Sequence, residues 1–163
     1  MDFKIEKALT SEIPRIRRFL AASWRESYKD ILPEKIIENA ITVWQTAEKI
    51  SDQITKDGRY FALAKDKRGK ILGLITARLR KDGDIYVSRL YVGSKYQGNG
   101  IGTALLNRLK TVFPAIKKIL LYVDAGNAKA RAYYLKYGFA ETGTKERIVL
   151  DYAKKLVVME KTL

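Results

Sequence analysis

Three glycines stand at every second position in the centre of the chain, within residues 97–103. The alternating apolar run before them, Ile85–Val92, predicts a strand, and the segment after them predicts an amphipathic helix. Backbone N–H groups point out of such a turn, and the dipole of the following helix favours negative charge there. The segment therefore predicts a site for a phosphorylated ligand, with a tight turn that binds nothing as the alternative.

Two other phosphate-binding patterns do not fit these glycines. A P-loop requires a lysine directly after its last glycine, and the chain has Thr103 after Gly102. A dinucleotide fingerprint requires the spacing G-x-G-x-x-G, whereas the segment from Gly98 to Gly102 has the spacing G-x-G-x-G. The phosphate ligand must therefore be identified from a second feature.

That feature is the segment 127–139, which reads NAKARAYYLKYGF. In order and spacing, the two segments resemble the Q/R-x-x-G-x-G/A loop and the N-x-x-A-x-x-[FY]-Y-x-x-x-G-F helix of the GNAT family of N-acetyltransferases. The resemblance covers roughly residues 70–140. Within the family, residues 24–28 (WRESY) and 159–163 (MEKTL) resemble the PaiA-type polyamine acetyltransferases.

The resemblance implies one N-acetyltransferase domain over residues 1–163, with acetyl-CoA as the cosubstrate. The strand Ile85–Val92 and a strand at 118–123 would splay apart, and the pantetheine arm would lie in the gap like an added strand. Asn127 also fits the N-cap of the second motif helix, and the two roles are compatible. The implied cofactor-binding residues are Leu90, Tyr91, Val92, Gln97, Gly98, Asn99, Gly100, Ile101, Gly102, Thr103, Asn127, Ala130, Tyr133 and Lys136.

The resemblance also assigns Tyr134 as the group that faces the sulfur of the cofactor. A tyrosine hydroxyl can protonate a departing thiolate without help from histidine or cysteine. The alternative is that Tyr134 only packs on the core face of its helix, beside Ala130, Tyr133 and Tyr137. Tyr133 points roughly 100° away around the helix and is the second candidate for the acid.

A base must accept a proton from the incoming amine, directly or through water. Many polyamine-acetylating relatives carry a glutamate just before Arg-[IL]-Tyr on the motif strand, where this chain has Ser88. Glu26, Asp84 and Asp124 are the substitutes. We expect Glu26 to be the catalytic base because the first helices usually line the acceptor side in this family, although a solvated surface carboxylate is the simpler reading.

The composition limits the chemistry further. The 163 residues include no Cys and no His, which excludes disulfides, thiolate metal ligands, a cysteine nucleophile and a histidine base. We therefore expect no metal and a direct transfer within a ternary complex. No apolar run is long enough for a membrane span, and no signal peptide is evident, so we expect a cytoplasmic protein that does not bind membranes.

The expected activity is acetyl transfer from acetyl-CoA to a primary amine, and we expect this amine to be a polyamine such as spermidine. A protein or peptide amine is the alternative acceptor, and a non-catalytic acyl-CoA-binding or nucleic-acid-binding module is the alternative class. The net charge of +14 attracts polyanions, but the basic residues are scattered, which disfavours nucleic acid as the partner. The sequence does not determine the oligomeric state, and a homodimer is one option. Polyamine binding would need a local acidic groove. The residues that could form the groove are Glu26, Asp30, Glu34 and Glu38.

Hydrophobic periodicity predicts the order β-α-α-β-β-β-α-β-α-β-β. A mixed sheet covered by helices fits this order. The resemblance implies an α/β (α+β) fold with a mostly antiparallel, splayed sheet flanked by helices. Thr10 is predicted to cap the first helix, with Pro14 in its first turn. Predicted strands cover 2–9, 60–65, 71–80, 85–92, 118–123, 139–150 and 154–163, and predicted helices cover roughly 10–28, 31–44, 101–113 and 127–137, with a further helical piece at about 46–56.

Overall fold

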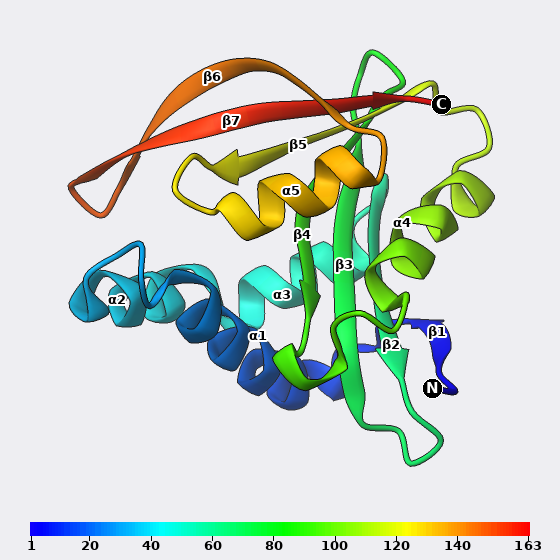
Figure 1. Ribbon diagram of the computed structural model, residues 1–163. Coiled ribbons are helices and arrows are strands. Elements are labelled where there is room, and N and C mark those ends of the chain that lie inside the picture. Colours follow the sequence, from blue (N-terminus) through cyan, green and yellow to red (C-terminus); the bar gives the residue numbers. More distant parts are fainter.

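The computed structural model describes all 163 residues apart from the side chain of Val149. The observed order matches the predicted one with one addition, since the helical piece expected at 46–56 is a separate helix, α3 (Figure 1). The helices are α1 (Ile13–Tyr28), α2 (Glu34–Trp44), α3 (Ala47–Thr55), α4 (Ile101–Val112) and α5 (Ala128–Lys136), with short turns η1 (Thr10–Glu12) and η2 (Ser94–Tyr96). The strands are β1 (Lys4–Lys7), β2 (Arg59–Lys65), β3 (Ile71–Leu79), β4 (Ile85–Val92), β5 (Lys118–Asp124), β6 (Ala140–Val149) and β7 (Tyr152–Thr162).

The seven strands form one sheet in the order β1-β2-β3-β4-β5-β7-β6. The pairing of β4 with β5 is parallel, whereas each of the other neighbouring pairs is antiparallel. The predicted mixed, mostly antiparallel sheet is therefore confirmed. Within the described residues, no helix is long and apolar enough to cross a membrane.

The parallel pairing of β4 and β5 is short. It joins Ile85 to Ile119 and Tyr86 to Leu120, and the two strands diverge beyond these positions. The register of β4 against β3 shifts just after the same point and leaves Ser88 as the extra residue of a β-bulge. The Ser88 hydroxyl lies 2.7 Å from the Thr76 hydroxyl, which ties the bulge to β3. The predicted splay of the two strands is thus present, and it begins beside the bulge.

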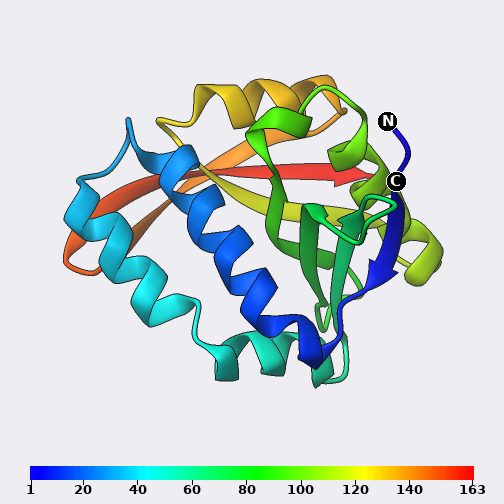
Figure 2. The ribbon, with the colours of Figure 1, turned by 90° about the horizontal axis from the view of Figure 1, so that it is seen from below.

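Helices cover both faces of the sheet, with α1 to α3 on one side and α5 on the other (Figure 2). On the α4 and α5 side, helix residues such as Leu105 and Tyr134 pack with Ile85, Leu121 and Met159 of the sheet. On the other side, α1 and α3 pack on β2 and β3 through a second cluster. The members of that second cluster are Ala8, Ile16, Leu20, Ile50, Ile54, Phe61, Leu63, Ile71 and Leu74.

The start of the first helix differs from the prediction. Thr10 belongs to η1 and makes no capping hydrogen bond, so the predicted cap is wrong. Instead, Glu12 binds a free backbone N–H at this end of the segment, because its Oε2 accepts a hydrogen bond of 3.1 Å from the N–H of Leu9. Thr46, by contrast, caps α3 by accepting from the N–H of Lys49 at 3.3 Å.

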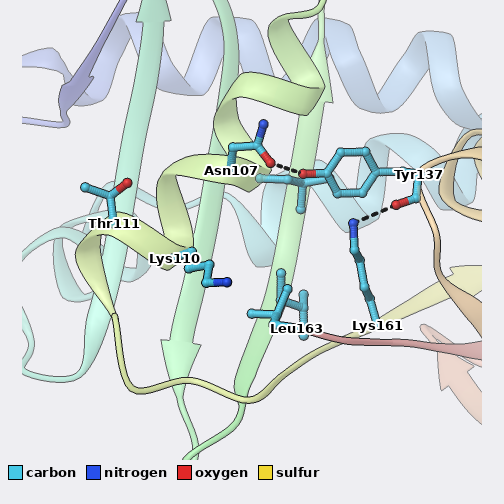
Figure 3. Close-up of a pocket in the computed structure, with 8 residues that line it drawn as sticks. Asn107, Lys110, Thr111, Tyr137, Lys161 and Leu163 are labelled. Carbon is cyan, nitrogen blue, oxygen red and sulfur yellow. Dashed lines mark hydrogen bonds between the residues drawn. The ribbon is translucent and has the colours of Figure 1, made fainter.

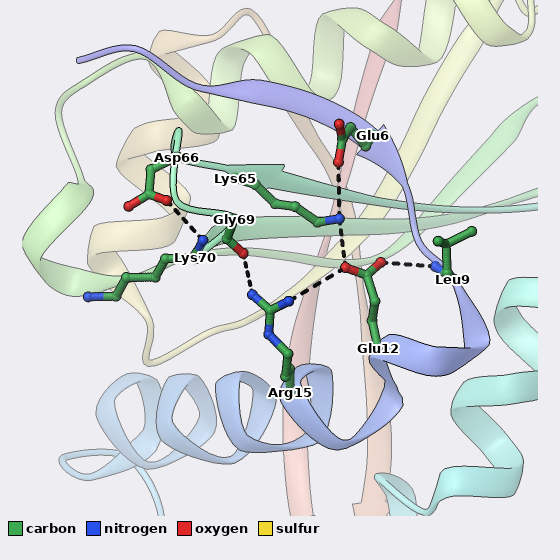
Figure 4. A network of polar contacts seen from close by, with 8 residues as sticks. All are labelled: Glu6, Leu9, Glu12, Arg15, Lys65, Asp66, Gly69 and Lys70. Atoms are coloured by element: carbon green, nitrogen blue, oxygen red, sulfur yellow. Dashed lines mark hydrogen bonds and ion pairs between the residues drawn. The ribbon is translucent and has the colours of Figure 1, made fainter.

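Glu12 is also the centre of a buried polar network that joins β1, α1 and β2 (Figure 4). The Lys65 ammonium lies 2.6 Å from Glu12 and 3.1 Å from Glu6, and Arg15 bonds the carbonyl of Gly69. Burial alone would raise the pKa of Glu12, but hydrogen bonds from Lys65 and from the Leu9 N–H outweigh it and lower that pKa. The ionised carboxylate is therefore the form that stabilises this corner of the fold.

We predict that Glu12→Gln lowers the free energy of unfolding by about 1–3 kcal/mol at neutral pH, because a buried charged hydrogen-bond network loses its acceptor. The folded pKa of Glu12 lies below its unfolded value. Its contribution is thus present above the unfolded pKa and is lost as pH falls through the folded pKa. Urea unfolding at neutral pH and near pH 3 measures this difference.

The matched control is Asp52→Asn, since Asp52 forms an exposed pair with Lys56 on α3. It should cost only about 0.3–0.5 kcal/mol. Equal losses for the two variants, or a Glu12→Gln loss that persists at low pH, would contradict the assigned role of Glu12.

Candidate functional site

A cavity of about 1170 Å³ lies between the end of β4, the start of α4, α5 and α1. The divergence of β4 from β5 turns the backbone of Leu90–Val92 toward this space. The cavity therefore adjoins the two motif segments that are far apart in the sequence. Its lining includes fifteen of the sixteen predicted site residues, namely Glu26, Leu90, Tyr91, Val92, Gln97, Gly98, Gly100, Ile101, Gly102, Thr103, Asn127, Ala130, Tyr133, Tyr134 and Lys136.

The glycine turn forms an open helix N-terminus at this cavity. Gly98 and Gly100 have φ values of +80° and +77°, a conformation that favours glycine, and Gly100 is the N-cap of α4. The first turn of α4 contains no acidic residue, so no carboxylate of that turn competes for its N–H groups. Asn99 is the one predicted site residue that does not line the cavity. Its Nδ2 instead donates to the carbonyls of Tyr96 and Gln97 and stabilises the turn. The turn has the geometry of an anion site.

Gly102 has a different reason to be glycine. A Cβ at this position would lie 2.8 Å from the Tyr133 hydroxyl oxygen. The missing side chain thus lets Tyr133 of α5 approach the first turn of α4, where its hydroxyl is 3.4 Å from the Thr103 hydroxyl. This contact places Tyr133 at the end of the cavity formed by the start of α4.

A smaller cavity of about 350 Å³ lies between α4, β5 and β7 and shares Tyr137 with the larger one (Figure 3). The Tyr137 hydroxyl bonds Asn107, while Lys161 donates to its carbonyl at 2.7 Å and lies 3.9 Å from its ring centroid. Tyr137 in turn stacks on Tyr133, with ring centroids 6.3 Å apart and planes 7° from parallel. These contacts fix the wall that supports Tyr133.

The start of α5 closes the cavity on the opposite side. Asn127 caps this helix, because its Oδ1 accepts from the N–H of Ala130 at 3.0 Å. The N-cap role that the sequence suggested is therefore present, and Asn127 still lines the cavity. Lys129 donates to Gln97 at 2.7 Å and links α5 to the glycine turn, a contact that no sequence pattern indicated.

Tyr134 is buried in the core and also lines the cavity. Its ring packs edge-on against Phe139 and Tyr133, with centroid distances of 5.3 and 5.2 Å. Burial raises the pKa of Tyr134 far above that of a free tyrosine, and the neighbouring Tyr133 and Tyr91 raise it further. The hydroxyl therefore stays protonated at neutral pH and can donate a proton or a hydrogen bond into the cavity.

The three candidate bases differ in position. Glu26 is exposed, lines the cavity and forms an ion pair of 3.0 Å with Lys29. Asp124 is buried in an ion pair with Lys154 and accepts a hydrogen bond of 2.9 Å from the Gly126 N–H. Asp84 precedes β4 in the β3–β4 hairpin, at the end of the strand away from Leu90–Val92, and is not among the residues that line the cavity. The topology thus removes Asp84 and leaves Glu26 as the accessible carboxylate.

Tyr28 is a site residue that sequence reasoning did not select. It lines the cavity, and its ring lies 4.5 Å from both the Trp24 ring and the Lys154 ammonium. Burial, together with Tyr91 and Asp124, raises the pKa of Tyr28 well above its ordinary value. The spacing of Trp24 and Tyr28 on one helix face was the available signal, but it reads equally as core packing.

A splayed sheet, an open helix N-terminus and a protonated tyrosine in one cavity define the class of acyltransferases that use a CoA thioester. The model of the acetyltransferase (GNAT) family matches residues 14–139, and the chain belongs to this family. It is therefore an N-acetyltransferase with acetyl-CoA as its cosubstrate. Among the described residues, no group of three or more Cys, His, Asp or Glu side chains could hold a metal ion.

Solved structures of other family members share the fold. PaiA N-acetyltransferase from Thermoplasma acidophilum, in complex with coenzyme A, has a TM-score of 0.88 at 23% identity and matches all of both chains. NAA60 from Arabidopsis thaliana, in complex with a bisubstrate analogue, has a TM-score of 0.74 at 16% identity over 99% of each chain. The ribosomal-protein-S18-alanine N-acetyltransferase from Escherichia coli has a TM-score of 0.68 at 18% identity over 99% of this chain and 94% of its own.

We predict that CoA stabilises the protein and that Gly100→Val abolishes most of this effect. A side chain at φ +77° would strain the turn and would stand where the phosphates approach. Linkage gives about 2.7 kcal/mol of stabilisation when the CoA concentration is about 100 times its Kd. Thermal unfolding with and without CoA measures it.

Gly83→Val is the matched control, because Gly83 has φ +84° in the β3–β4 hairpin, outside the cavity. It should unfold at a lower temperature and still gain the full stabilisation from CoA. A wild-type melting temperature that does not respond to saturating CoA would show that the cavity does not bind it.

Proposed function

We propose that the protein transfers the acetyl group directly to a primary amine within a ternary complex, with Tyr134 as the acid. The observation that supports this most is the position of Tyr134, which is anchored in the core and yet lines the same cavity as the glycine turn. Bound acetyl-CoA would supply the activated acetyl group. The turn at Gly98–Gly102 would hold its phosphates, and the backbone of Leu90 and Val92 would bind its arm.

Tyr134 would donate its proton to the sulfur as the bond to the acetyl carbon breaks. Glu26 would accept a proton from the amine, directly or through water, because of the three candidate bases it is the exposed one that lines the cavity. The chain has no Cys and no His, so neither residue can carry an acetyl group between the two substrates. The protein mass should therefore stay unchanged when acetyl-CoA is added without an amine.

The acceptor is the less defined partner. A polyamine such as spermidine and a peptide or protein amine are the two acceptors to compare, since solved structures of similar fold include proteins named for PaiA and for alanine acetylation. Of the four carboxylates expected to form an acidic groove, Glu26 and Asp30 line the cavity, beside Lys29. Glu38 is instead paired with Arg25 at 2.7 Å. The acidic groove is thus smaller than the sequence suggested.

The cytoplasmic location of the protein stays a prediction.

Tyr134→Phe tests the proposed mechanism. The hydroxyl is needed when the thiolate forms, so its loss should lower kcat by about 10²–10⁴-fold and leave the Kd for CoA nearly unchanged. The variant keeps the ring that packs on Phe139, so the fold should persist. Steady-state kinetics with spermidine and with short peptides, combined with CoA titration, measure both effects.

Tyr133→Phe is the matched control because it removes a hydroxyl from the adjacent ring at the phosphate end. It should weaken CoA binding slightly and cost far less in kcat. Near-normal turnover for Tyr134→Phe, or a greater loss for Tyr133→Phe, would contradict the assignment of the acid.

A further inference from the structure

The sheet has a cationic region on the side away from α4 and α5. The buried sheet residues of the apolar cluster beneath α1 and α3 belong to β2 and β3, and Tyr91 of β4 packs against their edge. Four cationic side chains lie there, and none forms an ion pair with a carboxylate in the part of the chain that the structure describes. With the aromatic residues between them they form the basic face, defined as Trp44, Arg78, Tyr86, Arg89, Tyr122, Lys145 and Arg147.

Aromatic rings hold three of these cations in place. Arg78 lies 5.2 Å from the ring centroid of Tyr86, and Lys145 lies 5.4 Å from that of Tyr122. The centroids of the two tyrosine rings are themselves 5.5 Å apart, so Tyr86 of β4 and Tyr122 of β5 form one continuous aromatic surface.

Arg147 bridges the long β6–β7 hairpin to α2, because its guanidinium lies 5.4 Å from the Trp44 ring centroid. Figure 1 shows this hairpin reaching out above α2. The basic face is therefore bordered by α2 at the end where the hairpin lies.

Of the four cations, Arg89 gives the strongest indication that the basic face binds an anion. It follows the bulge residue Ser88, is partly buried, and donates to Oε1 of Gln53 on α3, a neutral acceptor. A guanidinium carries five N–H donors, and a charge withdrawn from water is normally paired with an opposite charge. Burial lowers the pKa of Arg89, which is the cost that an anion would offset.

Two carboxylates of β5 and β7 on the same face form ion pairs. Asp124 pairs with Lys154, and Glu160 lies 3.5 Å from Lys118. The basic face continues to the cavity through Trp44, whose ring lies 5.6 Å from that of Trp24, and Trp24 contacts Tyr28 of the cavity wall. An acceptor that crosses this face meets its four cations before it reaches the cavity. Such a surface repels a polycation and attracts an anion.

We infer that the acceptor amine carries an acidic group, either a carboxylate or a phosphate, bound by Arg89 and Arg147. The ring of Tyr86, which lies between Arg78 and the Tyr122 ring on the same face, would hold the carbon skeleton. This inference rests on the proposed function and narrows its acceptor from any primary amine to an acidic one, away from polyamines.

The test compares acceptors of equal length that differ only in the far group. Pentylamine is neutral there, cadaverine carries an ammonium, δ-aminovalerate carries a carboxylate and aminopentyl phosphate carries a phosphate. The tripeptides Ala-Glu-Glu, Ala-Ser-Ser and Ala-Lys-Lys extend the series to peptide amines. We expect kcat/KM to be at least about tenfold higher for the acidic probes than for the cationic ones, as one charged hydrogen bond would give. Comparison of δ-aminovalerate with aminopentyl phosphate shows whether the basic face prefers a carboxylate or a phosphate.

Arg147→Gln and Arg89→Gln should each lower kcat/KM for the acidic probes by about 10- to 100-fold. Turnover of pentylamine should change little, and Arg89→Lys should restore part of the loss. Lys155→Gln is the matched control, since Lys155 lies on β7, one residue along from Lys154 and on the opposite face of the sheet.

A preference for cadaverine and Ala-Lys-Lys, or equal losses for neutral and acidic probes, would overturn the acidic acceptor and leave the acetyltransferase intact. Turnover of no probe at all would instead count against the proposed small-amine or peptide acceptor. In that case δ-aminovalerate should still raise the melting temperature of the CoA complex, and Arg147→Gln should abolish the shift. No shift in the wild-type protein would overturn the inference.

Discussion

The site depends on the early divergence of β4 and β5. A parallel pair that joins at only two positions leaves β4 beyond Tyr86 without a neighbouring strand on its β5 side, while its other edge pairs with β3. Unpaired strand groups are costly when buried and are a ready template for an extended ligand. The bulge at Ser88 adds local twist at the same point, and β5 turns instead to β7, with which it pairs over its whole length. The cavity follows from this geometry.

The same divergence explains how two distant motifs act together. The glycine turn follows the C-terminal end of β4, and α5 follows the C-terminal end of β5. Each of the two diverging strands therefore leads directly to one of the two motifs that line the cavity. The missing side chain of Gly102 lets the two helices meet through Tyr133. Tyr134, one residue on, points into the core and gains a raised pKa from that burial. Core packing and the raised pKa of Tyr134 are therefore two consequences of one position.

The regular elements could be predicted from local patterns. The bounds of β4 agree with the prediction at both ends, because its alternating residues stop at Asp84 and at Gly93, and the positive φ of Gly98 and Gly100 agrees with the expected anion turn. The splay of β4 and β5 followed only from the family resemblance, since no local pattern encodes the length of a parallel pairing. Thr10 failed as a cap because Glu12 satisfies the Leu9 N–H and is held by Lys65, 53 residues away along the chain (65 − 12).

The charge of the acceptor side could not be predicted at all. Glu38 seemed free to bind an amine, but Arg25 of α1 occupies it. Arg89 looked like one of many scattered cations, and only the fold shows that Gln53 and two tyrosines surround it without a carboxylate. Partners of charged side chains depend on tertiary contacts, so a net charge of +14 carries no information on where the unpaired charge lies.

The most direct test of the account is a crystal structure of the protein with bound CoA. The account predicts that the arm lies between β4 and β5, with the phosphates on the turn at Gly98–Gly102 and the sulfur within hydrogen-bonding distance of the Tyr134 hydroxyl. A CoA molecule whose sulfur lies away from Tyr134, or whose arm does not follow the free edge of β4, would contradict the central claim that strand divergence creates the site.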